Sequence, residues 1–262
     1  MGIFIRSLII CTVLLCACHN EHHPTHKKIR HINIKKTTRL DSCQSSPLCS
    51  IMIEVDDMTD TTVSTQNINQ TIALEAFGHA SYSLAQAADS FCTEYILRYK
   101  KELAHLYAAD QKRGIHSSWY DFKYRIAVKH QGGINGYHCY RIDKTKYEGG
   151  AFEHRQLSCL NFNGLTGKLV KLDDVLRPAC HTLLHPLLIN ELLRQFECNN
   201  REELQEKGLL RLTDIYIPAN YELGKDYISF IYNAGEIGPH KTGTIILPIP
   251  YTRIRTIMKP QK

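Results

Sequence analysis

The sequence predicts an α+β fold, in which two small domains with antiparallel sheets packed against helices follow a signal peptide and a flexible linker. Apolar side chains recur at three- and four-residue spacings over residues 83–110, the pattern of a helix with one buried face. Residues 120–129 alternate apolar and polar side chains, which indicates a strand with one buried and one wet face. With 43% hydrophobic and 22% charged residues, the 262-residue chain suits one or two globular domains.

The N-terminus predicts export. Arg6 precedes an apolar run from Leu8 to Ala17, and because a bilayer span needs about 20 apolar residues, residues 1–17 are predicted to be a cleaved signal peptide. The run ends in Leu15-Cys16-Ala17-Cys18, which resembles the lipobox of bacterial lipoproteins. That resemblance implies acylation of Cys18, palmitate included, and anchoring to a membrane of the cell envelope, on the periplasmic or outer side. An ordinary secretory signal is the alternative.

A polar, basic and histidine-rich linker is predicted over residues 18–45. It has no apolar periodicity, and Pro24 would break a helix that aligned His22 with His26, so a flexible spacer is favoured over a metal site. The signal and linker also hold most of the net charge of +6, since residues 42–262 carry a net charge of +1. The globular part therefore lacks the basic footprint of nucleic-acid-binding proteins, and no nucleic-acid partner is expected.

The cysteines beyond residue 42 do not form a recognisable metal or redox motif. Their count is odd and no Cys-x-x-Cys occurs, so neither a zinc ribbon nor a thioredoxin-type site is indicated. Cys43 and Cys49 are close enough in sequence to close a small disulfide loop. The alternative is that these residues are free thiols, which are common as buried apolar side chains.

The apolar pattern divides the rest of the chain into two α+β domains. Residues 46–145 hold a short strand near residues 50–55, a helical region, the long helix and two strands joined by glycine-containing turns, which predicts an antiparallel sheet. Residues 146–262 hold a helix with an apolar stripe, formed by Leu184, Leu188, Leu192 and Phe196.

Three motifs in the second half resemble one known family. Residues 147–154 are YEGGAFEH, residues 161–176 are NFNGLTGKLVKLDDVL, and residues 227–251 are YISFIYNAGEIGPHKTGTIILPIPY. Together, and in this order, they resemble the RsiV-like domain family of unknown function, and residues 46–145 are similar to the PdaC-like domain that precedes it. The family's histidine after Gly-Gly-Ala is Phe152 here, with His154 two residues later.

This resemblance implies a binding function at the cell envelope. RsiV-like domains bind lysozyme or accompany a peptidoglycan deacetylase, so the implied partner is a lysozyme-like protein or peptidoglycan. The expected function is a non-catalytic binding module without a cofactor. Irregular Gly- and Pro-containing loops between strands expose backbone and aromatic groups. The expected binding residues are accordingly Tyr147, Gly149, Gly150, Ala151, Tyr232, Glu236 and Pro239.

The sequence does not propose a catalytic site. Asp173-Asp174 followed by His181 and His185 superficially resembles the zinc site of polysaccharide deacetylases, but the spacing and the room left in the chain do not fit such a domain. It contains neither Gly-x-Ser-x-Gly nor His-Glu-x-x-His. We therefore expect no catalytic residue and no metal ligand. The alternatives are an envelope glycan hydrolase or deacetylase with an unrecognised site, and a structural envelope protein.

Overall fold

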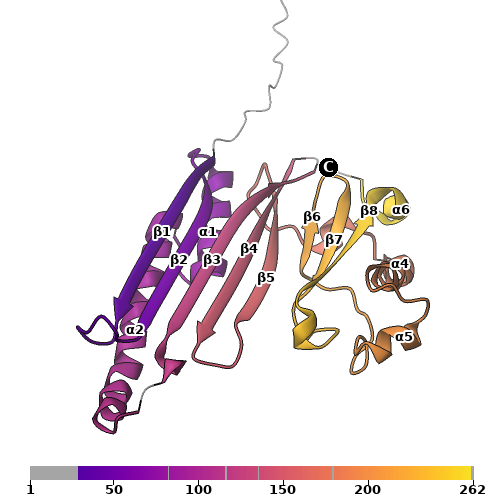
Figure 1. The fold of residues 1–262 in the computed structure, drawn as a ribbon. Helices are drawn as coiled ribbons and strands as arrows, with labels where there is room; N and C mark the ends of the chain where they lie inside the picture. The colour runs from indigo at the N-terminus through magenta and orange to yellow at the C-terminus, as the bar shows by residue number, and fades with distance from the viewer. Residues whose placement is uncertain (1–28, 82, 116, 135, 179, 261–262) are drawn as a thin grey trace, which may run out of the picture.

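The computed structural model describes residues 29–260, apart from residues 82, 116, 135 and 179 (Figure 1). The predicted signal peptide, Cys18 and the linker up to residue 28 lie outside the described residues. Two sheets and their helices form the described part, which confirms the α+β prediction. Among the described helices, none is long and apolar enough to cross a membrane.

A five-stranded sheet forms the first half, with its strands in sequence order (Figure 1). The strands are β1 (Ile29–Arg39), β2 (Leu48–Met58), β3 (Phe122–Gly132), β4 (Tyr137–Glu148) and β5 (His154–Asn163). Neighbours pair antiparallel except β2 and β3, which are parallel. The sheet is therefore mixed rather than purely antiparallel. The parallel pair arises because two helices form the long connection between β2 and β3, and parallel strands require such a crossover.

Those two helices cover one face of the sheet. They are α1 (Val63–Phe77) and α2 (Leu84–Lys112), the latter being the long helix that the sequence predicts. Ser83 caps α2, since its side chain accepts a hydrogen bond from the amide of Gln86. The buried side of the sheet contributes every second residue to the core, for example Ile51, Ile53 and Ile126.

Strand β1 overturns part of the predicted linker. Residues 29–39 pair with β2 along their whole length, and Ile32 and Ile34 contact the core under α2. The alternation of these two isoleucines with polar side chains is short and lies within a basic segment, so the sequence pattern did not predict the strand. The predicted domain boundary after residue 145 also falls inside β4, because β5 pairs with β4 and belongs to the same sheet.

The second half combines a three-stranded antiparallel sheet with short helices. Its strands are β6 (Tyr221–Leu223), β7 (Tyr227–Tyr232) and β8 (Ile245–Pro250). The α-helices are α3 (Leu172–Val175), α4 (Cys180–Gln195), α5 (Arg201–Glu206) and α6 (Tyr251–Ile254). Short 3₁₀ helices lie at Ser118–Tyr120 (η1), His240–Thr242 (η2) and Arg255–Ile257 (η3). The predicted leucine stripe of α4 packs against one face of this sheet.

Asparagine side chains join the two halves at the outer edge of β5. Asn220 accepts from the Cys159 amide at 2.9 Å and donates to the Leu157 carbonyl at 2.8 Å. Asn233 likewise accepts from the Leu157 amide at 2.7 Å. In the opposite direction, Asn161 of β5 donates to the backbone of Tyr221 and accepts from that of Leu223. We call this set of side chains the asparagine bridge. It satisfies backbone groups that a strand edge would otherwise leave unpaired.

Replacing Asn161 by alanine is expected to lower the free energy of unfolding by about 1–3 kcal/mol, because two buried backbone groups would lose their partners. Denaturant unfolding of the variant and the parent measures the effect. Gln156→Ala, on the exposed part of the same strand, is the matched control and is expected to change the value by less than about 0.5 kcal/mol. Equal stability of the two variants would contradict a bridging role for Asn161.

Candidate functional site

The face of the five-stranded sheet opposite α1 and α2 contains a groove of about 730 Å³. Its residues come from β2, β3, β4, β5 and the turn before β5, and most stand at every second position of a strand, which places them on one face. They are Ser50, Met52, Lys123, Tyr124, Arg125, Ala127, Asp143, Thr145, Tyr147, Glu153 and Arg155. We call this feature the open-face groove.

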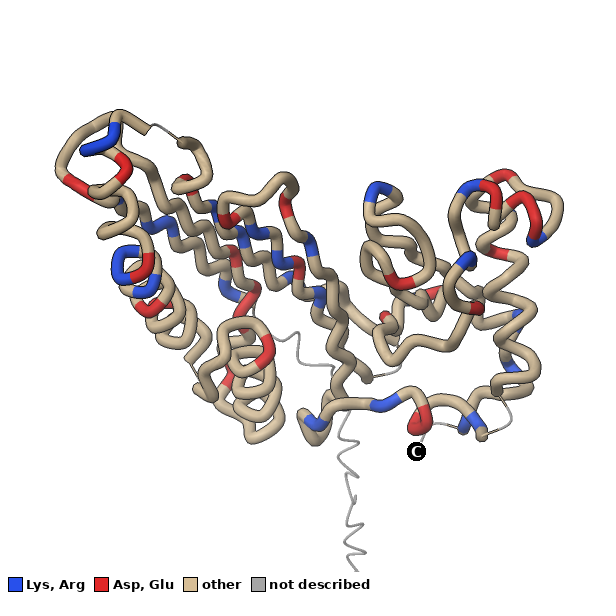
Figure 2. The backbone as a smooth tube through the Cα atoms, turned by 90° about the horizontal axis from the view of Figure 1, so that it is seen from below, with Lys and Arg blue, Asp and Glu red and all other residues tan. Residues whose placement is uncertain are grey.

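Three basic side chains and two carboxylates line the open-face groove. Figure 2 shows Lys and Arg positions along the strands of the large sheet. Lys123 and Arg125 are exposed, and the nearest carboxylate oxygen paired with Arg125 belongs to Glu54 at 3.7 Å, where an exposed ion pair contributes little. Arg155 is held more firmly, since its Nε lies 3.0 Å from Oδ1 of Asp143. The groove thus offers two accessible cations beside a fixed ion pair.

The first group of predicted binding residues lies partly in this groove. Tyr147 lines it, whereas Gly149, Gly150 and Ala151 form the turn between β4 and β5. Gly149 is needed for the turn itself, because its φ is 75° and a Cβ there would lie 2.0 Å from the backbone oxygen of Trp119. Gly149 is therefore a structural requirement of the hairpin that carries Tyr147.

Two thiols and a carboxylate meet where β6 approaches β4 and β5. Cys139 on β4 and Cys159 on β5 are buried, and Glu222 on β6 is half-buried. One ligand atom from each residue lies within 4.8 Å of the others. Arg141 fixes the carboxylate, with its Nε 3.2 Å and its Nη2 2.5 Å from Oε2 of Glu222. The sequence pattern predicted none of these four residues as functional.

The environment of Cys139 keeps its thiol protonated near neutral pH. The hydrogen bond with Cys159, together with burial, raises the pKa of Cys139 far above its ordinary value.

His181 and His185 join no comparable set among the described residues: His185 lies 3.9 Å from Asp214, and Asp174 accepts from the Lys171 amide at the start of α3.

Two solved structures and one family model are similar to this chain. The crystal structure of a DUF3298 family member from Bacteroides fragilis NCTC 9343 matches with a TM-score of 0.82 and 26% identity, over 89% of this chain and 94% of that one. A DUF3298 family protein from Pseudomonas aeruginosa PAO1 shares the fold, with a TM-score of 0.63 and 14% identity over 89% of this chain and 95% of that one. No curated protein matches. The model of the family described as "Protein of unknown function (DUF3298)" matches residues 173–252.

Residues 173–252 are therefore similar to the DUF3298 family, and we call them the DUF3298 segment. DUF3298 is the family of the RsiV-like domain, so the resemblance is confirmed for residues 173–252, which hold the end of the second motif and the whole of the third. The PdaC-like assignment of residues 46–145 stays a prediction. Because the Bacteroides fragilis structure covers 89% of the chain, the likeness to DUF3298 proteins also extends over most of the five-stranded sheet.

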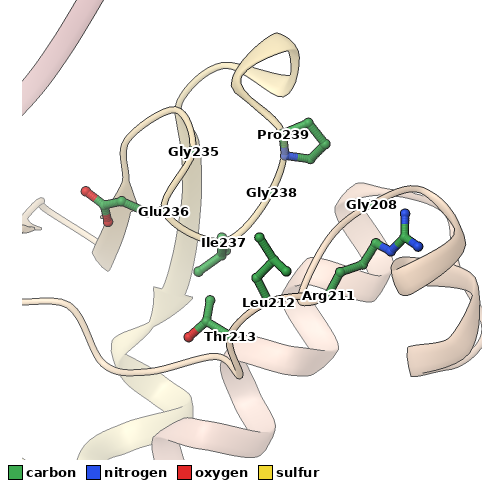
Figure 3. A pocket seen from close by; sticks show the side chains of 9 residues that line it. All are labelled: Gly208, Arg211, Leu212, Thr213, Gly235, Glu236, Ile237, Gly238 and Pro239. Atoms are coloured by element: carbon green, nitrogen blue, oxygen red, sulfur yellow. The ribbon is translucent and has the colours of Figure 1, made fainter.

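The second group of predicted residues belongs to the DUF3298 segment and lies apart from the groove. Glu236 and Pro239 line a smaller pocket of about 430 Å³ between the loops after α5 and after β7 (Figure 3). Figure 3 shows Leu212 beside Ile237, with the Glu236 carboxylate pointing away from the Arg211 guanidinium. No residue lines both this pocket and the open-face groove. The structure therefore divides the predicted surface between two places.

Tyr232, which the sequence predicts as an exposed binding residue, is buried instead. It is fully covered in the core of the DUF3298 segment, and its hydroxyl donates to the backbone oxygen of Tyr216 at 2.5 Å. The hydroxyl of Tyr216 in turn donates to Glu236 at 2.8 Å. Tyr232 is the last residue of β7, and the alternation of side chains along this strand points it into the core. The prediction gave more weight to the loop that follows.

The structure keeps Cys43 and Cys49 as free thiols rather than as the predicted disulfide. Burial raises the pKa of Cys49 to about 12, whereas hydrogen bonds with Ser45 lower the pKa of the exposed Cys43 thiol.

We expect iodoacetamide at pH 7.5 to alkylate Cys43 first and to reach Cys49 and Cys139 only after unfolding. Peptide mass spectrometry of timed samples measures the order. If Cys43 stayed unmodified until a reductant was added, the result would support the predicted Cys43–Cys49 disulfide instead.

Proposed function

We propose that this protein is a non-catalytic binding module held at the cell envelope, and that its open-face groove binds peptidoglycan. The observation that carries the proposal is the pair of exposed cations, Lys123 and Arg125, beside Tyr147 on a rigid sheet. Sites on strands hold their side chains in fixed relative positions, which favours recognition of a repeating polymer.

The chemistry of the groove suits an anionic glycopeptide. Ammonium and guanidinium groups bind carboxylates through charge-assisted hydrogen bonds, and the stem peptides of peptidoglycan carry carboxylates. Thr145 and Ser50 add hydroxyl groups, and the half-buried ring of Tyr147 offers an apolar surface with a polar end for a sugar. A lysozyme-like partner ranks second, because a basic protein such as hen lysozyme would be repelled by the same cations.

Reversing the two exposed charges tests the groove. Lys123→Glu/Arg125→Glu is expected to weaken co-sedimentation with purified peptidoglycan by about tenfold or more, because each attractive contact becomes repulsive. The matched control is Lys100→Glu/Lys101→Glu, which makes the same charge change on exposed positions of α2. The control is expected to sediment like the parent. Equal loss in both variants would show that only net charge matters.

The same mixture distinguishes the competing functions. Release of sugar, acetate or peptide from peptidoglycan would replace the binding module by an envelope glycan hydrolase or deacetylase. A complex with hen lysozyme and no sedimentation with peptidoglycan would favour a lysozyme-like partner. A parent protein that binds neither would favour a structural envelope protein.

We also propose that Cys18 carries the lipid that anchors the module. Replacing Cys18 by serine is expected to move the protein from the membrane to the soluble fraction and to abolish labelling with a clickable palmitate analogue. Cys11→Ser, within the predicted signal peptide, is the control and should remain membrane-bound and labelled. Retention of the Cys18→Ser protein on membranes would rule out this anchor.

A further inference from the structure

We propose that Cys139, Cys159 and Glu222 bind a zinc ion at the junction of the two sheets. The three residues come from β4, β5 and β6, so the ion would connect the large sheet to the DUF3298 segment. Thiolate and carboxylate are ordinary zinc ligands, and two thiolates favour zinc over magnesium or calcium, which prefer oxygen.

The distances already approach those of a coordinated ion. Zn–S and Zn–O bonds of about 2.3 and 2.1 Å place the ligand atoms of a tetrahedral site roughly 3.5–3.8 Å apart. In this structure the two Sγ atoms and a carboxylate oxygen lie within 4.8 Å of one another. Small rotations of the side chains would therefore complete the set, and a water molecule or another small ligand would supply the fourth position.

The sheet register favours a shared ion over a disulfide. Cys139 is paired with Asn161, and Cys159 with Arg141, so the two cysteines are diagonal rather than directly opposite neighbours. Diagonal positions on paired strands are separated by about 7–8 Å. Disulfides usually join Cα atoms about 4.4–6.8 Å apart. A covalent bond would thus require the backbone of β4 and β5 to move, whereas an ion between the sulfurs would not.

Charge balance supports a divalent ion in this partly buried place. Two thiolates, the Glu222 carboxylate, the Arg141 guanidinium and Zn²⁺ together carry no net charge, which keeps the cost of burial low. Without the ion, the neutral thiols and the Arg141–Glu222 ion pair are also balanced. Binding therefore exchanges one Zn²⁺ for the two thiol protons, which leave to solvent.

Arg141 orients the carboxylate for this role. Both of its hydrogen bonds, and the contact from the Cys159 thiol at 3.7 Å, fall on Oε2 of Glu222. No described residue makes a hydrogen bond to Oε1, which leaves that oxygen available as a ligand. Outer partners of this kind fix the position of a ligating carboxylate and are part of many metal sites.

Cobalt and zinc titration of the full chain tests the proposal. After reduction, treatment with a chelator and removal of both reagents, Co²⁺ is expected to bind at one ion per chain with thiolate-to-cobalt absorption in the near ultraviolet. Zn²⁺ should abolish that absorption, release two protons per ion in weakly buffered solution, and raise the Tm. A parent protein with no such absorption, or with no proton release, would overturn the proposal.

Variants separate this site from the other thiols. Cys159→Ser should lose the absorption and Glu222→Gln should weaken Zn²⁺ binding by at least tenfold, with circular dichroism confirming that both are folded without metal. The matched control, Cys43→Ser/Cys198→Ser, removes two thiols outside the cluster and should bind like the parent. Unchanged absorption in Cys159→Ser, or a Cys139–Cys159 disulfide in protein isolated without reductant, would overturn the proposal.

Discussion

The asparagine bridge is the interaction on which the rest of this structure depends. β5 is the last strand of a five-stranded sheet, and an uncovered last strand would expose a row of unpaired backbone groups. Asn220 and Asn233 bond that edge, and Asn161 bonds β6 in return. Each side-chain amide both donates and accepts, so it replaces a missing strand. The edge of one sheet thereby becomes the attachment point of the other.

This mode of attachment explains why part of a sheet face stays accessible. α1 and α2 occupy one face, and the DUF3298 segment is fixed at the β5 edge, where Leu157, Cys159 and Ile231 form a small apolar cluster. The contacts of β6 with the large sheet involve β4 and β5. The open-face groove between β2 and the start of β5 lies beyond it, so its cations need not be desolvated by the second half of the protein.

The sequence predicts the elements of this fold better than their connections. α2, β3 and the leucine stripe of α4 follow from strong periodicity, because burial of one face imposes the pattern directly. The sequence pattern did not predict β1, because only Ile32 and Ile34 mark its side toward the core. The parallel pairing of β2 with β3, and the bridge formed by three asparagines far apart in sequence, leave no periodic signal, because they depend on tertiary contacts alone.

The proximity of Cys139 and Cys159 can nevertheless be predicted from the sequence. A turn centred on Gly150 pairs each residue of β4 with its mirror image on β5, which sets Cys139 opposite Asn161 and Cys159 opposite Arg141. All four side chains therefore lie on one face. What the hairpin could not supply is Glu222, because β6 reaches that face through tertiary contacts, such as those with Asn161 and Arg141.

The same register makes fold and proposed function inseparable. A slip of β5 by one residue against β4 would turn every side chain of the strand to the opposite face. Asn161 would then leave β6, Cys159 would leave Cys139, and Arg155 would leave the groove. Because the bridge, the thiol cluster and the groove all require one register, the hydrogen bonds that Asn220 and Asn233 make to defined backbone groups of β5 hold the two candidate sites in place together.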